Sequence, residues 1–279
     1  MIFIKHILTL QNLIIKEKKA AHTIGFVPTM GALHKGHIAL VTKARTENNL
    51  VVCSIFVNPT QFNNIEDLKK YPKTIENDID MLEEAGCDIL FLPEVAEMYT
   101  ANEINKHFAL GNLETILEGK YRTGHFQGVC MIVDKLLNTV TPNKMYVGRK
   151  DYQQCMVLAK MIVQEKQEAK LIICDTVREK DGLAMSSRNK RLNEVERQGA
   201  VRIIETLNYI KKNIKAGDLG QLKENASFFL TENGFRVDYA EIADAETLVL
   251  QDNWDGEKKL VALVAAHLNE VRLIDNIVL

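Results

Sequence analysis

The sequence contains few cysteines, and none of them stands in a spacing typical of a metal site. The five are scattered and mostly lie in apolar stretches: Cys53, Cys87, Cys130, Cys155 and Cys174. No two are separated by only two residues, and an odd number cannot all pair within one chain. The pattern therefore predicts neither a disulfide framework nor a thiolate metal site. Buried thiols in a reducing compartment fit this usage, so we expect a cytoplasmic protein.

A large net charge and long apolar runs are also absent. The 279 residues carry a net charge of −2, which gives no reason to expect DNA or long RNA, because phosphate neutralisation dominates nucleic-acid affinity. No run approaches the roughly 18 apolar residues of a membrane helix. The apolar N-terminus is interrupted by Lys5 and is followed by no small-residue cleavage site, which indicates a strand and a helix rather than a signal peptide. We expect neither a nucleic-acid nor a membrane partner.

Five apolar runs rich in β-branched residues predict a buried parallel sheet. They cover residues 23–29, 50–57, 88–93, 144–148 and 170–177. Continuous runs of this kind are typical of strands covered on both faces. One apolar stripe at helical spacing predicts a helix that begins near Gly128; its residues are Val129, Ile132, Val133, Leu136, Leu137 and Val140. Strands alternating with helices indicate an α/β fold with a Rossmann-like doubly wound sheet.

The pattern changes after about residue 176. A polar loop at 178–190 leads to helical segments between 193 and 233, and short strands are predicted at 235–244, 247–251, 259–268 and 271–275. This order is typical of a smaller α+β domain. We therefore predict a Rossmann-like domain over residues 1–176, which binds nucleotide and substrate, and a C-terminal α+β domain over residues 177–279.

The turn VPTMGALHKGHIAL, residues 27–40, carries two histidines directly after a predicted strand. Ligands in open α/β sheets bind beyond the carboxyl ends of strands, where helix N-termini supply unpaired N–H groups. His34 and His37 are three residues apart and would share a face of one helical turn. Their spacing alone leaves three interpretations open: phosphate binding, a surface or capping role, and a metal pair that lacks a third ligand.

A resemblance narrows these interpretations. HKGH is similar to the HxGH signature of nucleotidyltransferases, and six motifs in order resemble the pantothenate synthetase family: VPTMGALHKGH, SIFVNPTQF, YPKT, YRTGHFQGV, GRKDYQQ and REKDGLAMSSRN, with LIDN near the end. The resemblance implies a two-step ligation with ATP and Mg²⁺. The carboxylate of (R)-pantoate attacks ATP to give pantoyl adenylate and pyrophosphate, and β-alanine then displaces AMP. It also implies a homodimer.

The same resemblance assigns a set of ATP-binding residues. They are Met30, Gly31, Ala32, Leu33, His34, Lys35, Gly36, His37, Gly148, Arg149, Lys150, Asp151, Val177, Met185, Ser186, Ser187 and Arg188. Among them it implies catalytic roles for His37, His34, Lys150, Ser186, Ser187 and Arg188. His37 would be the acid in adenylation, because a donor aimed at the departing pyrophosphate favours the transition state.

Asn58, Gln61 and Gln154 match the positions that bind the small substrates. An amide suits pantoate because it can donate to a carboxylate and accept from a hydroxyl. Gln154 also has capping-box spacing with Asp151, so a structural role stays open.

Asp78 matches the family position that contacts magnesium, although a carboxylate on a polar helix face is ordinarily solvated. The serines of MSSR are predicted not to cap a helix, because NEVE at 193–196 forms its own cap.

Three residues depart from the family pattern. Arg149 replaces a frequent glutamate or glutamine, Thr60 replaces a frequent apolar residue, and Thr123 replaces a frequent proline.

Two other functions stay open. Another nucleotidyltransferase with an HxGH motif is disfavoured by Gln61 and Gln154, which match the pantoate part of the pattern. A noncatalytic nucleotide-binding or RNA-binding module is disfavoured by the acidic balance and the intact histidine pair.

Overall fold

The computed structural model describes residues 1–100 and 106–279, which divide into two compact units. Unit 1 comprises Met1–Arg149 and Gln153–Asp175, and unit 2 comprises Lys150–Tyr152 and Thr176–Leu279. Three residues from the middle of the unit 1 sequence thus belong to the second unit. In the described ranges, no helix combines the length and the apolar character that crossing a membrane requires.

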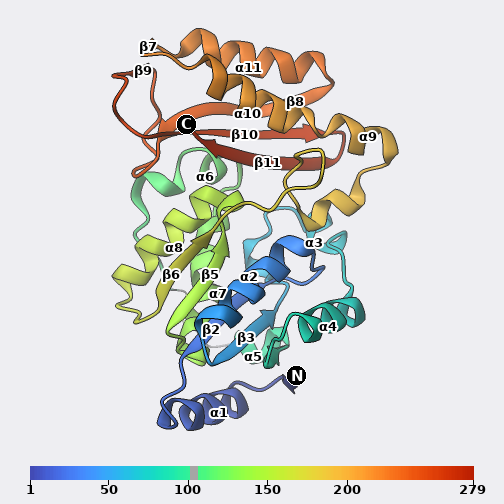
Figure 1. Ribbon diagram of the computed structural model, residues 1–279, viewed down its shortest axis with the longest axis vertical. Helices are drawn as coiled ribbons and strands as arrows, with labels where there is room; N and C mark the ends of the chain where they lie inside the picture. The colour runs from blue at the N-terminus through green and yellow to red at the C-terminus, as the bar shows by residue number, and fades with distance from the viewer. Residues whose placement is uncertain (101–105) are drawn as a thin grey trace. The chain divides into compact units, whose positions relative to one another are not determined.

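Unit 1 is built on a six-stranded parallel sheet with the order β1-β4-β3-β2-β5-β6. Figure 1 labels four of these strands, β3, β2, β5 and β6. Its strands are β1 (Ile2–Ile4), β2 (Ile24–Thr29), β3 (Leu50–Ile55), β4 (Ile89–Phe91), β5 (Lys144–Gly148) and β6 (Lys170–Cys174). All five predicted runs form strands, and the N-terminal residues add the sixth. The expectation that every run is fully buried is wrong for β6, in which no residue is buried. The physical reason is that β6 is an edge strand with one neighbour.

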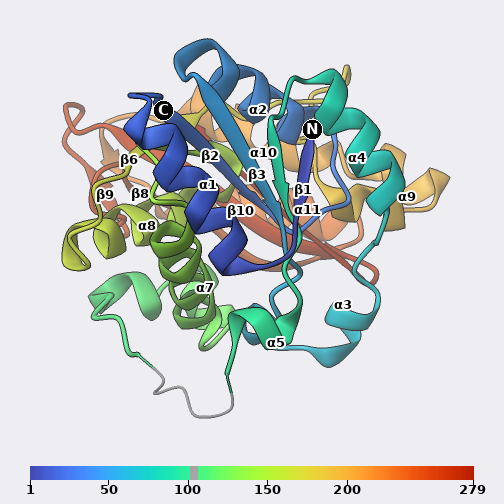
Figure 2. The ribbon, with the colours of Figure 1, turned by 90° about the horizontal axis from the view of Figure 1, so that it is seen from below.

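Helices cover both faces of this sheet. The helices between Met1 and Asp175 are α1 (Ile7–Lys19), α2 (Lys35–Glu47), α3 (Ile65–Lys69), α4 (Ile75–Glu84), α5 (Val95–Met98), α6 (Glu118–Tyr121), α7 (His125–Val140) and α8 (Tyr152–Gln164), with the short 3₁₀ helices η1 (Pro59–Gln61), η2 (Gly111–Glu114) and η3 (Arg149–Asp151). Figure 2 shows α1 and α7 on one face and α2 and α4 on the other. The predicted doubly wound α/β fold is therefore confirmed.

The predicted apolar helix is α7, and all six residues of its stripe are buried. It begins at His125, three residues before the expected start. Gly128 lies inside the helix because α7 packs against η1 there, and a side-chain carbon at Gly128 would collide with the carbonyl oxygen of Thr60. The helix is thereby held directly against the loop that follows β3.

The chain order places a switch point between the neighbouring strands β2 and β5. The chain continues from β2 to β3 on one side of the sheet and from β5 to β6 on the other. Ligands of open α/β sheets bind at such a point, beyond the carboxyl ends of the strands. The turn containing His34 follows β2, and residues 148–151 follow β5.

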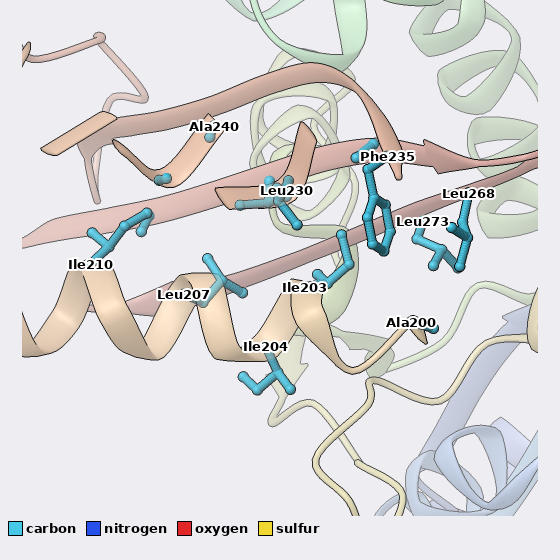
Figure 3. Packing of buried hydrophobic residues seen from close by; sticks show 14 of the residues in the cluster. Ala200, Ile203, Ile204, Leu207, Ile210, Leu230, Phe235, Ala240, Leu268 and Leu273 are labelled. Atoms are coloured by element: carbon cyan, nitrogen blue, oxygen red, sulfur yellow. The ribbon is translucent and has the colours of Figure 1, made fainter. Parts of the chain in front are cut away.

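Unit 2 packs helices against one face of an antiparallel sheet with the order β11-β10-β8. The strands of this sheet are β8 (Phe235–Asp244), β10 (Leu260–Leu268) and β11 (Val271–Val278), and β7 (Gly217–Asp218) pairs with β9 (Asn253–Trp254) in a second, two-stranded sheet. The helices of unit 2 are η4 (Ser187–Arg191), α9 (Glu194–Gly199), α10 (Arg202–Asn213) and α11 (Gly220–Glu232). Figure 3 shows Ile203, Leu207 and Ile210 of α10 pointing toward this sheet. The predicted smaller α+β fold is confirmed.

One predicted strand of unit 2 is wrong. Residues 247–251 form only a single bridge, between Leu250 and Ala243. The side chain of Asp244 accepts the N–H groups of Glu246 and Thr247, and Leu248 adopts a φ of 57°. This turn reverses the chain before a strand can form.

Candidate active site

The loop after β2 is fixed by a buried carboxylate. Gly31 and Ala32 have φ values of 78° and 49°, and Asp78 near the start of α4 accepts the N–H groups of Ala32 and Leu33 at 2.8 Å each. Thr74 donates a third hydrogen bond to Asp78 at 2.9 Å. No motif or spacing in the sequence indicated this anchoring role. The magnesium contact assigned to Asp78 stays a prediction.

His34 and His37 form a capping box at the N-terminus of α2. Nδ1 of His34 accepts the N–H of Gly36 at 3.1 Å, and Nδ1 of His37 accepts the N–H of His34 at 3.3 Å. The two ring centroids are 4.0 Å apart, as the shared-face prediction requires. A neutral imidazole that accepts at Nδ1 carries its hydrogen on Nε2. Capping thus fixes both rings as Nε2–H donors.

The electrostatics of this helix terminus suit an anion. The N-terminus of α2 carries the partial positive charge of the helix dipole, and its first turn holds no acidic side chain. Lys35 and Gly36 lie in this first turn. The arrangement of amides, imidazoles and dipole can stabilise phosphate oxygens.

Asn58 and Gln61 lie together at η1, and both are buried. Nδ2 of Asn58 donates to Oε1 of Gln61 at 3.2 Å and to the carbonyl of Gly128 at 3.0 Å. Nε2 of Gln61 lies 2.9 Å from Sδ of Met30. Two of the residues assigned to substrate binding are therefore in contact with each other, and one of them contacts a residue assigned to ATP.

Tyr99 contacts the side chain of Asn58. Its hydroxyl donates to Oδ1 of Asn58 at 2.7 Å, and the hydroxyl of Thr60 donates to the same oxygen at 3.0 Å. The N–H of Thr60, which can only donate to Oδ1, and the carbonyl of Gly128, which can only accept from Nδ2, fix the amide so that Nδ2 faces Gln61. The sequence reasoning missed Tyr99, which lies 41 residues from Asn58 and belongs to none of the motifs.

Gln154 lies in α8 next to Gln153, whose side chain has a structural role. Gln153 is buried and its amide contacts Glu118, Leu113 and Ile116. Gln154 is partly exposed, and its roles in pantoate binding and in a capping box with Asp151 both stay predictions.

Arg149 forms an ion pair with Asp175, at 2.5 Å between Nη1 and Oδ1. The pair joins the ends of β5 and β6 inside unit 1. The next residue, Lys150, belongs to unit 2 and pairs with Asp151 at 3.5 Å. The two neighbouring cations thus have separate acidic partners.

The MSSR segment of unit 2 follows a hairpin. The N–H of Met185 donates to the carbonyl of Val177 at 3.0 Å, and Arg178 bridges Ala184. The expectation that the serines are not used in capping is wrong for Ser186, whose hydroxyl accepts the N–H of Arg188 as the cap of η4. A separate 3₁₀ helix begins at Ser187, ahead of α9. The capping box predicted at NEVE is confirmed for Asn193 and Glu196.

The cysteines lie away from reactive surroundings. Burial raises the pKa of the Cys53 thiol well above its usual value and raises those of Cys87 and Cys130 to about 12. Such thiols are poor nucleophiles. Across residues 1–100 and 106–279, no group of three or more His, Cys, Asp or Glu side chains is arranged to hold a metal ion.

The sheet is doubly wound, and the histidine pair caps the helix that follows β2 at its switch point, where open α/β sheets bind nucleotides and other ligands. A sequence model of the Pantoate-beta-alanine ligase family matches residues 2–278. The chain belongs to this family.

Individual relatives agree with this assignment. A pantothenate synthetase of Cytophaga hutchinsonii is 43% identical over 100% of this chain and 99% of its own. A crystal structure of pantothenate synthetase from Thermus thermophilus is 38% identical with a TM-score of 0.90, covering 99% of both chains. A pantoate-beta-alanine ligase from Francisella tularensis, complexed with beta-gamma ATP and beta-alanine, is 36% identical with a TM-score of 0.81 over 100% of this chain and 97% of its own.

Proposed function

We propose that this protein ligates (R)-pantoate and β-alanine to pantothenate with ATP, through a pantoyl adenylate. The observation that carries the proposal is the capping box of His34 and His37 after β2, in a chain that matches the ligase family over residues 2–278. The box turns two Nε2–H groups into oriented donors at a helix N-terminus, which suits a reaction that expels a polyanion.

In the first step, a carboxylate oxygen of pantoate attacks the α-phosphorus of ATP, and the bond to the β-phosphate oxygen breaks. Negative charge moves onto the departing pyrophosphate. His37 donates to this charge and His34 reinforces it, while Lys150 and the Ser186, Ser187 and Arg188 segment hold phosphate oxygens. The remaining ATP contacts are those assigned from the family resemblance.

Asn58, Gln61 and Gln154 bind pantoate, and Gln61 also contacts β-alanine. Because Asn58 donates to Oε1 of Gln61, the other end of the Gln61 amide is a donor that suits a carboxylate. In the second step, the amine of β-alanine attacks the carbonyl carbon of the adenylate, AMP leaves with the bonding electrons, and the nitrogen loses a proton.

Magnesium bound to ATP would offset the charge of the triphosphate. Asp78 fits a metal ligand poorly, since its carboxylate already accepts the hydrogen bonds of Ala32, Leu33 and Thr74. We further propose a cytoplasmic homodimer without nucleic-acid or membrane partners, on the basis of the family resemblance, the net charge of −2 and the buried thiols.

The test is an incubation of the purified protein with MgATP, to which (R)-pantoate and β-alanine are added singly and together. AMP and pantothenate are measured, with (S)-pantoate as the matched control. Pantothenate should form only with all three substrates. Nucleotidyl transfer to a different acid or phosphate would indicate another enzyme with an HxGH motif, and ATP binding without turnover would indicate a noncatalytic module.

A further inference from the structure

Two adjacent residues of β11, Asp275 and Asn276, are buried polar side chains of unit 2 with exposed fractions of 3% and 4%. They belong to the LIDN motif, and the proposed mechanism assigns no role to either residue. Asp275 contacts Arg178, which precedes the MSSR segment, and Asn276 contacts Lys150. Both of these segments carry groups assigned to the phosphates of ATP.

Asp275 stands on the apolar face of its strand. Val271, Leu273 and Ile277 alternate with it and belong to the hydrophobic core of unit 2. A carboxylate in such a position is costly unless it is paired. Arg178 pairs with it through two hydrogen bonds, at 2.6 and 3.1 Å.

Arg178 lies at the base of the hairpin that precedes MSSR. Besides Asp275, it donates to the carbonyl of Gly182 at 3.0 Å, and its backbone bridges Ala184. Met185–Arg188 follow at once in the sequence. A bidentate pair between a planar guanidinium and a carboxylate fixes direction as well as distance, so Asp275 fixes where the MSSR segment starts.

Asn276 points to the other face of the strand, as alternation requires. Its Nδ2 donates to the carbonyl of Lys150 at 2.8 Å. The hydroxyl of Tyr152 donates to the carbonyl of Ala245 at 2.7 Å. These two bonds hold residues 150–152 in unit 2, although their sequence neighbours belong to unit 1.

We propose that Asp275 and Asn276 are positioning residues that fix Lys150 and the MSSR segment relative to each other for binding of the triphosphate. The inference rests on the proposed function, in which both segments contact phosphates. A buried ion pair is often no more stabilising than an apolar pair of the same volume. We therefore infer that Arg178 and Asp275 set geometry rather than stability.

The test compares three variants: Asn276→Ala, Arg178→Lys, and the double variant Asp275→Leu with Arg178→Met. We measure thermal unfolding, MgATP affinity by direct titration, and the KM for ATP and for pantoate in pyrophosphate exchange. If the phosphate-binding groups lose their positions, the affinity for MgATP and the rate of pyrophosphate exchange should each fall by about tenfold to a hundredfold. The KM for pantoate should not change. The double variant should keep near-wild-type thermal stability and still show this loss.

A matched control is Asp238→Asn, which breaks a partly buried ion pair on the same sheet. Asp238 accepts a hydrogen bond from Arg272 at 2.8 Å, near the start of β11. This variant should lose stability but keep the wild-type affinity for ATP. Asn276→Ser is the substitute if the alanine variant does not fold.

Wild-type ATP affinity in the Asn276 variant and in the double variant would overturn the inference, as would equal losses of ATP and pantoate affinity. Absence of exchange in the wild-type protein would instead contradict the proposed function. Direct ATP titration would in that case still test the positioning role.

Discussion

At the scale of single residues, the proposed mechanism gives the two histidines a chemical task on a different ring atom from the one that caps α2. Capping occupies Nδ1 of His34 and of His37, which places the hydrogen of each neutral ring on Nε2. A capping role and a phosphate role are therefore compatible, although the sequence presents them as alternatives.

His37→Ala should slow adenylation roughly a hundredfold to a thousandfold, because losing one oriented donor costs about 2.7 to 4 kcal/mol of barrier. His37→Asn is the matched control for folding, since its carbonyl oxygen can replace Nδ1 as the acceptor of the cap. We expect the asparagine variant to unfold at the wild-type temperature and to remain slow in single-turnover measurements. Wild-type turnover in either variant would remove His37 from the mechanism.

Tyr99→Phe should weaken pantoate binding through Asn58 and Gln61. The variant removes a donor to Oδ1 of Asn58, and a lost hydrogen bond of this kind is worth about 0.5–1.5 kcal/mol. The KM for pantoate should rise by roughly twofold to tenfold, and the KM for ATP should not change. Tyr121→Phe, at an exposed tyrosine, is the control. An unchanged KM for pantoate would show that Asn58 holds its orientation without Tyr99.

At the scale of elements, the end of α2 opposite the histidines is tied to β5 through one carboxylate. Glu47 pairs with Lys43 at 2.6 Å and with Lys144 at 3.0 Å, and it accepts the hydroxyl of Tyr146 at 2.9 Å. Lys43, Lys144 and Tyr146, in that order, lower the pKa of Glu47 from 4.5 to about 2. Burial raises the pKa of Tyr146 to about 12, so its hydroxyl stays protonated as a donor.

Glu47→Gln should lower the thermal midpoint at neutral pH. The folded-state pKa of Glu47 lies below its unfolded value, so its stabilisation is fully present above about pH 4.5 and is lost as the pH falls toward 2. The difference in midpoint between wild type and variant should therefore shrink across this range. Glu66→Gln, which breaks an exposed pair with Lys69, should have little effect at any pH. A difference that grows as the pH falls would contradict this account.

At the scale of the whole molecule, the groups assigned to the phosphates belong to both units. The histidine pair is in unit 1, whereas Lys150 and the MSSR segment are in unit 2. The GRKD motif is divided between the units. Arg149 pairs with Asp175 inside unit 1, and Lys150 pairs with Asp151 inside unit 2.

Pantoate and MgATP alone should support exchange of labelled pyrophosphate into ATP, because the carboxylate is activated before any amine is needed. Release of AMP without β-alanine should be slow if the mixed anhydride is shielded from water. Ser187→Ala combined with Arg188→Ala should depress the exchange rate. Exchange that requires β-alanine in the wild-type protein would force a concerted scheme or a strictly ordered one with three substrates.

The sequence by itself determined the features that depend on near neighbours along the chain. Apolar runs give the strands of the parallel sheet, the stripe ending at Val140 gives α7, and NEVE gives the cap of α9. The turn after β2 places both histidine rings together because three residues separate them. The motifs were sufficient to identify the family, since their order and composition are properties of the sequence itself.

Only the tertiary structure decided which distant groups share a hydrogen bond. Asp78 and Ala32 are 46 residues apart, Tyr99 and Asn58 are 41, and Asn276 and Lys150 are 126. The edge position of β6 also depends on the tertiary structure, and so does the assignment of Lys150–Tyr152 to unit 2. Local propensity and periodicity act over a few residues, whereas these contacts exist only after strands have paired and helices have packed. That is why the sequence predicted candidate phosphate-binding and substrate-binding residues but not the side chains that contact and anchor them.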